Sequence, residues 1–340
     1  MVRKIARRSR SYPKIDVHTH VALPEVLALA SKVKIRGKEP GKQHWVPSAS
    51  RQEHGRQSSS ASATLSKPKP RLKDMDRMGV DMQVISMNLP TPSYWADGAT
   101  GQQIARQCND SIAEFVAAYP ERYIGLGAVP LQDQSRTVKE LEYLAEIGLK
   151  GVAIPSHVRA KDLGIPKFRN FWAKAEELNL PIYIHPRGFT HDQRLHEFFL
   201  WNSVGQPLEE TLAMTSIIYE GILDDFPKLK IIIAHGGGYL PYYAGRTDKA
   251  YESRPETRKN IASRPSDYLS RFFYDTVIFD RDMLPLLVKK AGDRQIMMGT
   301  DYPRGEIEED PIGFVRRSKD LSPLSKDRII GLNAAKLFNI

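Results

Sequence analysis

Residues 14–20 read KIDVHTH, a short stretch in which apolar and polar residues alternate and which ends in two histidines. Because successive side chains of a β-strand point to opposite faces, His18 and His20 would share one face at the end of such a strand. Neutral imidazole is a good ligand for zinc and similar cations. The stretch therefore predicts a strand that ends either in part of a metal site or in two hydrogen-bonded structural histidines.

Further apolar runs of similar length recur along the chain. They occupy residues 82–88, 123–129, 151–157, 181–186, 229–236, 272–279 and 295–301. Most are continuous and rich in Ile and Val, as strands covered on both faces are. Helical patterns separate most of these runs; in residues 101–119, for example, Ile104, Cys108 and Ile112 fall on one helical face.

Strands that alternate with helices in this way predict an α/β fold, a (β/α)₈ TIM barrel. The alternative is an open doubly wound sheet, but no G-x-G-x-x-G loop follows the first strand to favour it. We expect a basic N-terminal tail over residues 1–13 and a single metal-dependent barrel domain over 14–340. Residues 31–70, rich in Ser, Lys, Gly and Pro, predict a polar loop insertion between strands one and two. Such a loop would lie over the active-site face, either as a lid or without a role.

The charge balance of the 340-residue chain is basic, with 50 Lys and Arg against 40 Asp and Glu. Five of the basic residues lie in VRKIARRSR near the N-terminus, without an acidic one among them. This excess indicates either contact with nucleic acid or membranes, or a solvated tail and attraction for anionic substrates. We favour the second interpretation, because no zinc-finger, RNA-binding or basic-zipper pattern accompanies the charges. We therefore predict an anionic small-molecule substrate and no nucleic-acid or membrane partner.

The cellular location is expected to be cytoplasmic. The only cysteine, Cys108, excludes a disulfide framework and allows a reducing compartment. No apolar run approaches the roughly 18 residues of a membrane span, and the N-terminus lacks the apolar core of a secretory signal.

Histidines gather where the predicted strands end. Of the nine in the chain, five lie at such ends: His18, His20, His157, His185 and His235. Asp301 ends the last strand in the same way. The carboxyl ends of barrel strands meet at the catalytic face. We therefore favour a joint metal site over the alternative that these histidines have separate structural roles.

In this combination and order the chain resembles the amidohydrolase superfamily. Longer stretches are similar to the branch that contains 2-amino-3-carboxymuconate-6-semialdehyde decarboxylase and related non-oxidative aromatic decarboxylases. They include SYWA (93–96), GLGAVPLQ (125–132), VGQPLEET (204–211), FPKLKIIIAHGGGYLPYYAGR (226–246), SRP (253–255) and GTDYP (299–303).

The resemblance implies one divalent metal held by His18, His20, His185 and Asp301, with His235 as the catalytic acid/base beside a metal-bound water and Asp301 also in the catalytic set. We expect zinc, with manganese as the alternative. A second metal would need a lysine or glutamate at the end of strand four, and GVAIPSH (151–157) has neither.

Arginine is suited to binding a substrate carboxylate, because its planar fork pairs with both oxygens. The candidates for substrate binding are Arg51, Arg187, Arg254, Arg304 and, as a pocket wall, Trp201. The resemblance implies that Arg254 reaches into the neighbouring subunit's site, and hence a homodimer. Arg187 and Arg304 replace aromatic residues of the similar enzymes, which indicates a different and more anionic substrate.

Two functions are compatible with these residues. The first is a carbon–carbon lyase, which removes CO₂ from an aromatic or dienoic acid without oxidation. The alternative is a hydrolase of a lactone, ester or amide, because the same ligands serve both reactions.

Overall fold

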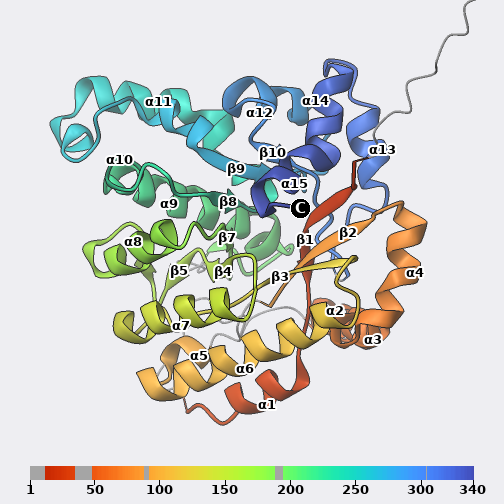
Figure 1. Cartoon of the computed structure of the whole chain (residues 1–340). Helices are drawn as coiled ribbons and strands as arrows, with labels where there is room; N and C mark the ends of the chain where they lie inside the picture. The colour runs from red at the N-terminus through yellow and green to blue at the C-terminus, as the bar shows by residue number, and fades with distance from the viewer. Residues whose placement is uncertain (1–11, 35–47, 88–91, 188–193, 304) are drawn as a thin grey trace, which may run out of the picture.

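The computed structural model describes residues 12–34, 48–87, 92–187, 194–303 and 305–340. Eight parallel strands form two sheets, ordered β1-β2-β3 and β10-β9-β8-β7-β4. Parallel bridges join the sheets on both sides, between Gly127 and Val152 and between Thr19 and Tyr302. The strands therefore form a ring, and helices surround it (Figure 1). This is the predicted (β/α)₈ barrel.

Each of the eight predicted strands is present. Their bounds are β1 (Ile15–His20), β2 (Met82–Ser86), β3 (Tyr123–Leu126), β4 (Val152–Pro155), β7 (Ile182–His185), β8 (Ile231–Ile233), β9 (Phe272–Asp275) and β10 (Ile296–Met297). A short antiparallel pair, β5 (His157–Val158) and β6 (Lys161–Asp162), follows β4. Nearly all residues of the eight strands are buried, which explains their continuous apolar sequences.

The helices lie between the strands and around the ring. Their bounds are α1 (Pro24–Ala30), α2 (Ser48–Ser60), α3 (Ser62–Ser66), α4 (Pro68–Met78), α5 (Pro92–Trp95), α6 (Gly98–Ala117), α7 (Gln134–Glu146), α8 (Arg169–Glu177), α9 (Gln206–Tyr219), α10 (Ile222–Asp225), α11 (Leu240–Ser253), α12 (Met283–Ala291), α13 (Pro311–Arg316), α14 (Pro323–Asp327) and α15 (Asn333–Phe338). In α6 the predicted face with Ile104, Cys108 and Ile112 is buried. None of the described helices combines the length and the apolar character needed to cross a bilayer.

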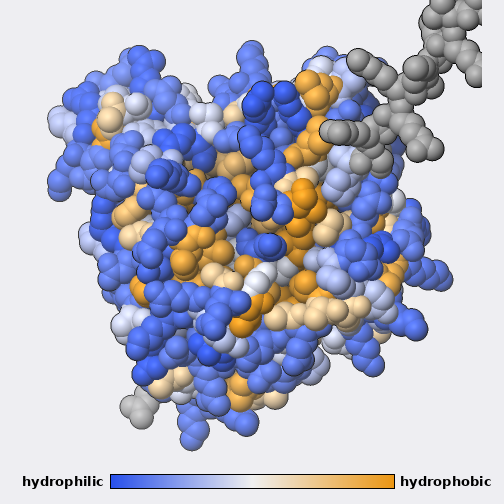
Figure 2. All heavy atoms as spheres, viewed as in Figure 1, coloured by the Kyte–Doolittle hydropathy of each residue, from blue (hydrophilic) through white to orange (hydrophobic). Residues whose placement is uncertain are grey.

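The apolar core has two parts. The inner part consists of strand residues such as Val17, Val84 and Ile232, and α15 closes it with Leu337 and Phe338. The outer part lies between the strands and the surrounding helices. In the view of Figure 2, apolar atoms are visible toward the centre of the molecule, and polar side chains cover much of the periphery.

The region predicted as a polar loop differs from the expectation. In its described part, residues 48–66 form α2 and α3, and α4 begins at Pro68. Composition was a poor guide, because residues 48–66 are mostly polar and still form helices. The next helix, α4, buries Arg71, Met75 and Met78. The helix ends where Gly79 adopts a left-handed φ of 70°, a conformation that glycine allows without strain. Residues 35–47, and residues 1–11 of the predicted tail, lie outside the described residues.

Candidate active site

The end of β1 brings both of its histidines to the inside of the barrel. The pairing of β1 with β2 shifts register between Asp16 and Thr19. Val17 packs in the inner core, and the neighbouring His18 ring also lies inside, 5.4 Å from the ring of Tyr183. In a regular strand adjacent residues point to opposite faces. The irregularity therefore explains how the adjacent Val17 and His18 can both face inward.

His185 ends β7 and faces the histidines of β1. The ring centroids of His18 and His185 lie 5.1 Å apart, and those of His20 and His185 lie 4.7 Å apart. Nδ1 of His185 donates a hydrogen bond to the carbonyl of Pro186 at 2.8 Å. Because a carbonyl only accepts, this bond assigns the proton to Nδ1 and leaves Nε2 as a donor of electrons to a metal.

His235 and Asp301 enter the site from loops after β8 and β10. Both have left-handed backbones, with φ of 48° and 64°. Such backbones are uncommon in residues other than glycine and gather at functional sites. A Cβ on Gly236, the residue after His235, would lie 2.4 Å from the side chain of Ile278, so only glycine fits this tight turn.

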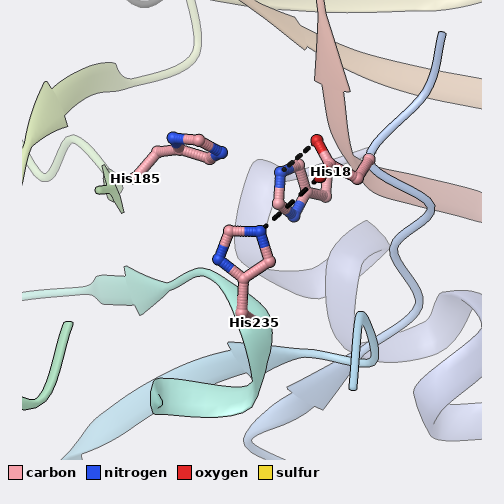
Figure 3. Close-up of side chains that lie close together, drawn as sticks. His18, His185 and His235 are labelled. Carbon is pink, nitrogen blue, oxygen red and sulfur yellow. Dashed lines mark ion pairs between the residues drawn. The ribbon is translucent and has the colours of Figure 1, made fainter. Parts of the chain in front are cut away.

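The side chains of His18, His185 and His235 lie close together at the mouth of the barrel (Figure 3). Oδ1 of Asp301 lies 3.2 Å from Nε2 of His18 and 2.9 Å from Nε2 of His20. Oδ2 of Asp301 lies 3.6 Å from Nε2 of His235. The possible ligand atoms of His18, His185, His235 and Asp301 all lie within 4.8 Å of one another.

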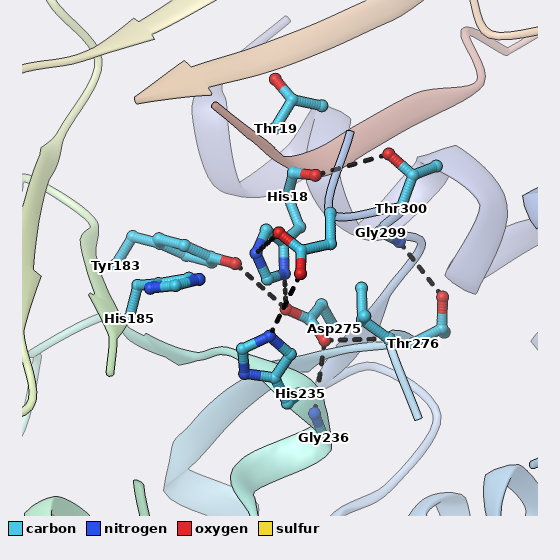
Figure 4. A network of polar contacts seen from close by, with 12 residues as sticks. His18, Thr19, Tyr183, His185, His235, Gly236, Asp275, Thr276, Gly299 and Thr300 are labelled. Carbon is cyan, nitrogen blue, oxygen red and sulfur yellow. Dashed lines mark hydrogen bonds and ion pairs between the residues drawn. The ribbon is translucent and has the colours of Figure 1, made fainter. Parts of the chain in front are cut away.

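Asp275 supports the cluster from below and was not predicted (Figure 4). Nδ1 of His18 lies 2.7 Å from Oδ2 of Asp275, and the hydroxyl of Tyr183 donates to the same oxygen at 3.1 Å. The backbone N–H groups of Gly236 and Val277 donate to Oδ1 at 3.3 and 3.0 Å. A carboxylate in this position orients a ligand histidine and raises its basicity. The available signal was an acidic residue at the end of an otherwise apolar strand, β9.

Glu210 of α9 supports His235 in the same way and was also missed. Its Oε1 lies 2.5 Å from Nδ1 of His235, and its side chain is fully buried. Burial raises the pKa of Glu210 to about 7. Buried carboxylates are rare on an otherwise apolar helix face, so Glu210 within PLEETLAM was the signal.

The electrostatics of the site suit a cation. Burial lowers the pKa of His20 and of His185, which favours neutral imidazoles. Burial opposes ionisation of Asp301, but the histidines around it outweigh burial and hold its pKa well below the usual value. At His18 burial also opposes the charge, yet Asp301 and Asp275 raise its pKa to about 9. His20 and His185 are therefore neutral, as metal ligands must be, whereas His18 has to give up a proton when an ion binds.

The donor set therefore fits one divalent cation. It offers several imidazole nitrogens and one carboxylate oxygen from four separate strand ends. Nitrogen-rich sites of this kind hold zinc and similar ions. Three or four protein ligands leave a coordination position for water or substrate.

The remaining predicted residues lie elsewhere in the structure. Arg51 is exposed on α2, and Arg254 is exposed where α11 ends. Trp201 is only 5% exposed and packs against Phe199 and His54, at centroid distances of 5.0 and 6.0 Å. Arg304 lies outside the described residues.

Arg187 and His157 are nearer to strand ends. Arg187 follows His185 by two residues, is half-buried, and opposes the rise in the pKa of Tyr94 that burial causes. His157 shares the barrel mouth but faces Glu209, whose Oε2 lies 3.8 Å from its Nε2. The structure thus separates His157 from the predicted joint site.

A comparison with protein families assigns the chain. The profile of the family described as amidohydrolase matches residues 15–340, and the chain belongs to this family. Family membership agrees with the barrel and with the metal-type cluster at the strand ends.

Several similar proteins are named as decarboxylases. The chain is 30% identical over 329 residues to 2-amino-3-carboxymuconate-6-semialdehyde decarboxylase of Dictyostelium discoideum, covering 96% of this chain and 92% of that protein. It is 28% identical to gamma-resorcylate decarboxylase of a Rhizobium species, over 79% and 86% of the two chains. The crystal structure of 5-carboxyvanillate decarboxylase from Sphingomonas paucimobilis superposes with a TM-score of 0.81 at 27% identity, over 97% and 100% of the two chains.

Several of the similar structures carry manganese. Dihydroxybenzoic acid decarboxylase from Polaromonas, solved with bound manganese and the inhibitor 2-nitroresorcinol, has a TM-score of 0.80 at 25% identity, over 97% of each chain.

Proposed function

We propose that the protein is a metal-dependent, non-oxidative decarboxylase of an aromatic or dienoic carboxylic acid. The observation that carries this proposal is the cluster of His18, His185, His235 and Asp301. His20 joins it through Asp301, at 2.9 Å, and the buried Glu210 holds His235. The names of the similar proteins favour decarboxylation over the hydrolase alternative.

His18, His20, His185 and Asp301 would hold the metal. Zinc suits these nitrogen-rich donors, and the manganese of the Polaromonas enzyme makes that ion the second candidate. When bound, the ion supplies a positive charge that orients and polarises oxygens of the substrate. Asp275 keeps the imidazole of His18 turned toward this position through its Nδ1 contact at 2.7 Å.

His235 would move the proton. Its Nε2 faces the cluster, and its Nδ1 is held by Glu210 at 2.5 Å. Burial opposes the charge on His235, but Glu210 and Asp301 raise its pKa well above the usual value, which favours an imidazolium that can donate. Transfer of this proton to the carbon that carries the carboxylate allows the C–C bond to break. CO₂ leaves, and the electrons of that bond return to the carbon skeleton.

The substrate would be an anionic small molecule. Arg187 brings a guanidinium to the end of β7, two residues beyond His185, where a second anionic group could pair with its fork. This placement supports the expectation of a more anionic substrate. A cytoplasmic location stays a prediction that depends on the single, buried Cys108.

A substrate screen tests the proposal. The protein would be loaded with zinc or manganese and offered carboxylated phenols, muconate semialdehydes and lactones, while CO₂ release and absorbance are followed. We expect CO₂ release from one of the carboxylic acids and one metal equivalent per chain. Hydrolysis without CO₂ release would establish the alternative function, and two equivalents of metal, or none, would contradict the single site.

We also propose that the working unit is a homodimer in which Arg254 serves the neighbouring subunit's site. Arg254 is exposed at the end of α11, and Tyr239 and Tyr243 are 41% and 67% exposed at the start of this helix. Exposed aromatic residues of this size are enriched at interfaces between subunits.

Hybrid dimers test this arrangement. Arg254→Ala protein mixed with His185→Ala protein should recover about a quarter of the parental activity, because half of the random dimers would be hybrids with one complete site. Each variant alone should be nearly inactive. A fully active monomer in analytical sedimentation, or no recovery in hybrids shown to form, would contradict the proposal.

A further inference from the structure

The proposed metal ligands lie on both sides of a seam in the barrel. His18 and His20 belong to β1, whereas Asp301 follows β10. The two strands are not paired within one sheet; a single bridge between Thr19 and Tyr302 joins them. Three backbone hydrogen bonds cross the same boundary: Val17 N to Met298 O at 2.9 Å, Asp301 N to His18 O at 2.9 Å, and His20 N to Tyr302 O at 2.8 Å. The spacing of the ligands therefore depends on how firmly this seam is held.

One buried side chain of α4 reaches one edge of the seam directly. Arg71 is 0% exposed, and its Nη1 donates to the carbonyl of His20 at 2.7 Å. The same nitrogen donates to the carbonyl of Thr64 in α3 at 3.0 Å. Its Nε and Nη2 donate to Oε1 of Gln83 in β2 at 3.1 and 2.9 Å. One guanidinium thus connects α3, β1 and β2.

The opposite edge of the seam is held by the same helix. The ring of Tyr302, next to Asp301, lies 4.8 Å from Cζ of Arg71, within the range of a cation–π contact. The Tyr302 hydroxyl donates to Oδ2 of Asp74 at 2.7 Å. Arg71 and Asp74 are three residues apart, and therefore neighbours on one face of α4.

A second path runs from Arg71 through buried polar groups. Nε2 of Gln83 donates to Oδ2 of Asp16 at 3.4 Å, and the hydroxyl of Thr300 donates to the same oxygen at 2.6 Å. The other oxygen of Asp16 accepts from the backbone N–H of His18 at 3.1 Å. This path also joins β1 to the segment that carries Asp301.

The hydrogen-bond partners of Arg71 are neutral, namely two carbonyls and one amide oxygen. Burying a guanidinium is expensive, and a sequence that needed only packing would place an apolar residue here. The contacts are explained if the guanidinium of Arg71 sets the relative positions of the segments around it. One planar group with five directed donors can hold several segments at fixed distances.

We propose that Arg71 is a positioning residue of the metal centre: it holds the main chain of His20 and the ring of Tyr302, and so fixes the distance between the β1 ligands and Asp301. Through its bond to Thr64, Arg71 also ties α3 to the ligands. This inference rests on the proposed metal centre. Lysine cannot replace the fork, because a single ammonium cannot reach the same acceptors in the same plane.

The test compares metal affinity in Arg71→Lys and Arg71→Met with a matched control, Arg106→Met. Arg106 also makes two hydrogen bonds to a buried partner, with Nε and Nη2 each 2.9 Å from Glu140, but it joins α6 to α7 and touches no proposed ligand. Dissociation constants for zinc and manganese would be measured by competition with a chelator. Thermal unfolding and the visible spectrum of the cobalt-loaded protein would be recorded on the same samples.

We expect both Arg71 variants to bind metal about 10- to 100-fold more weakly, the usual effect of removing a group that orients a ligand. Their cobalt spectra should change, because the angles between ligands change. Arg106→Met should melt at a lower temperature and keep the parental metal affinity and spectrum. Tyr302→Phe removes the hydroxyl that bonds Asp74 and keeps the ring beside Arg71. It should show a smaller loss in the same direction and serves if Arg71→Met does not fold.

Parental affinity in folded Arg71→Lys and Tyr302→Phe would overturn the inference, as would an equal loss in Arg106→Met. A parental protein that binds no divalent metal would instead contradict the proposed function.

Discussion

His235→Ala is expected to keep its metal and to lose about 10²- to 10⁴-fold in turnover, the usual contribution of a general acid or base. The structure places its Nε2 at the cluster, 3.6 Å from Asp301, and its Nδ1 against Glu210. Four other side chains remain to hold the ion, so the loss should fall on proton transfer. Metal content and kcat would be measured on the same preparation.

Two variants sharpen this prediction. Glu210→Gln keeps a side chain of similar size but removes the negative charge that favours the imidazolium, so turnover should also fall, by less than in His235→Ala. His157→Ala removes a histidine of the same barrel mouth that faces Glu209, and it should keep its metal. If His235→Ala lost metal as readily as His185→Ala, His235 would be a ligand. If it kept near-normal turnover, the proton carrier would be another residue, and His157 would be tested next.

His185→Ala is expected to purify without metal and to show no measurable turnover. Removing a direct ligand should weaken binding by more than the 10- to 100-fold that loss of an orienting partner causes. The rings of His18 and His20 lie 5.1 and 4.7 Å from the ring of His185. The alanine therefore removes the imidazole that faces both of these histidines.

Thermal unfolding with added metal provides a second measurement. Metal at 100 times its dissociation constant should stabilise the parental protein by about 2.7 kcal/mol, which raises the melting temperature. His185→Ala should show no such shift, whereas His54→Ala, whose ring packs on Phe199 and Trp201, should shift as the parent does. A parental metal content in His185→Ala would remove it from the ligand set.

The barrel could be predicted because its strands are buried on both faces. Such strands are mostly apolar along their length, and the runs at 152–155 and 231–233 show this directly. The histidines could be predicted to meet because a closed ring of parallel strands brings all of its carboxyl ends to one face. Helix-forming residues in 48–66 carried no comparable signal, since that segment buries few apolar side chains and its composition also suits a loop.

The sequence by itself determined the order of strands, the face on which chemistry would occur, and the residues that converge there: His18, His20, His185, His235 and Asp301. Only the tertiary structure decided what supports them. Asp275 lies 257 residues from His18, which it contacts. Glu210 lies 25 residues from His235, and Arg71 lies 51 residues from His20. Their roles depend on burial and on hydrogen-bond direction, and these properties exist only after distant segments have packed together, when an unpaired polar group has become costly.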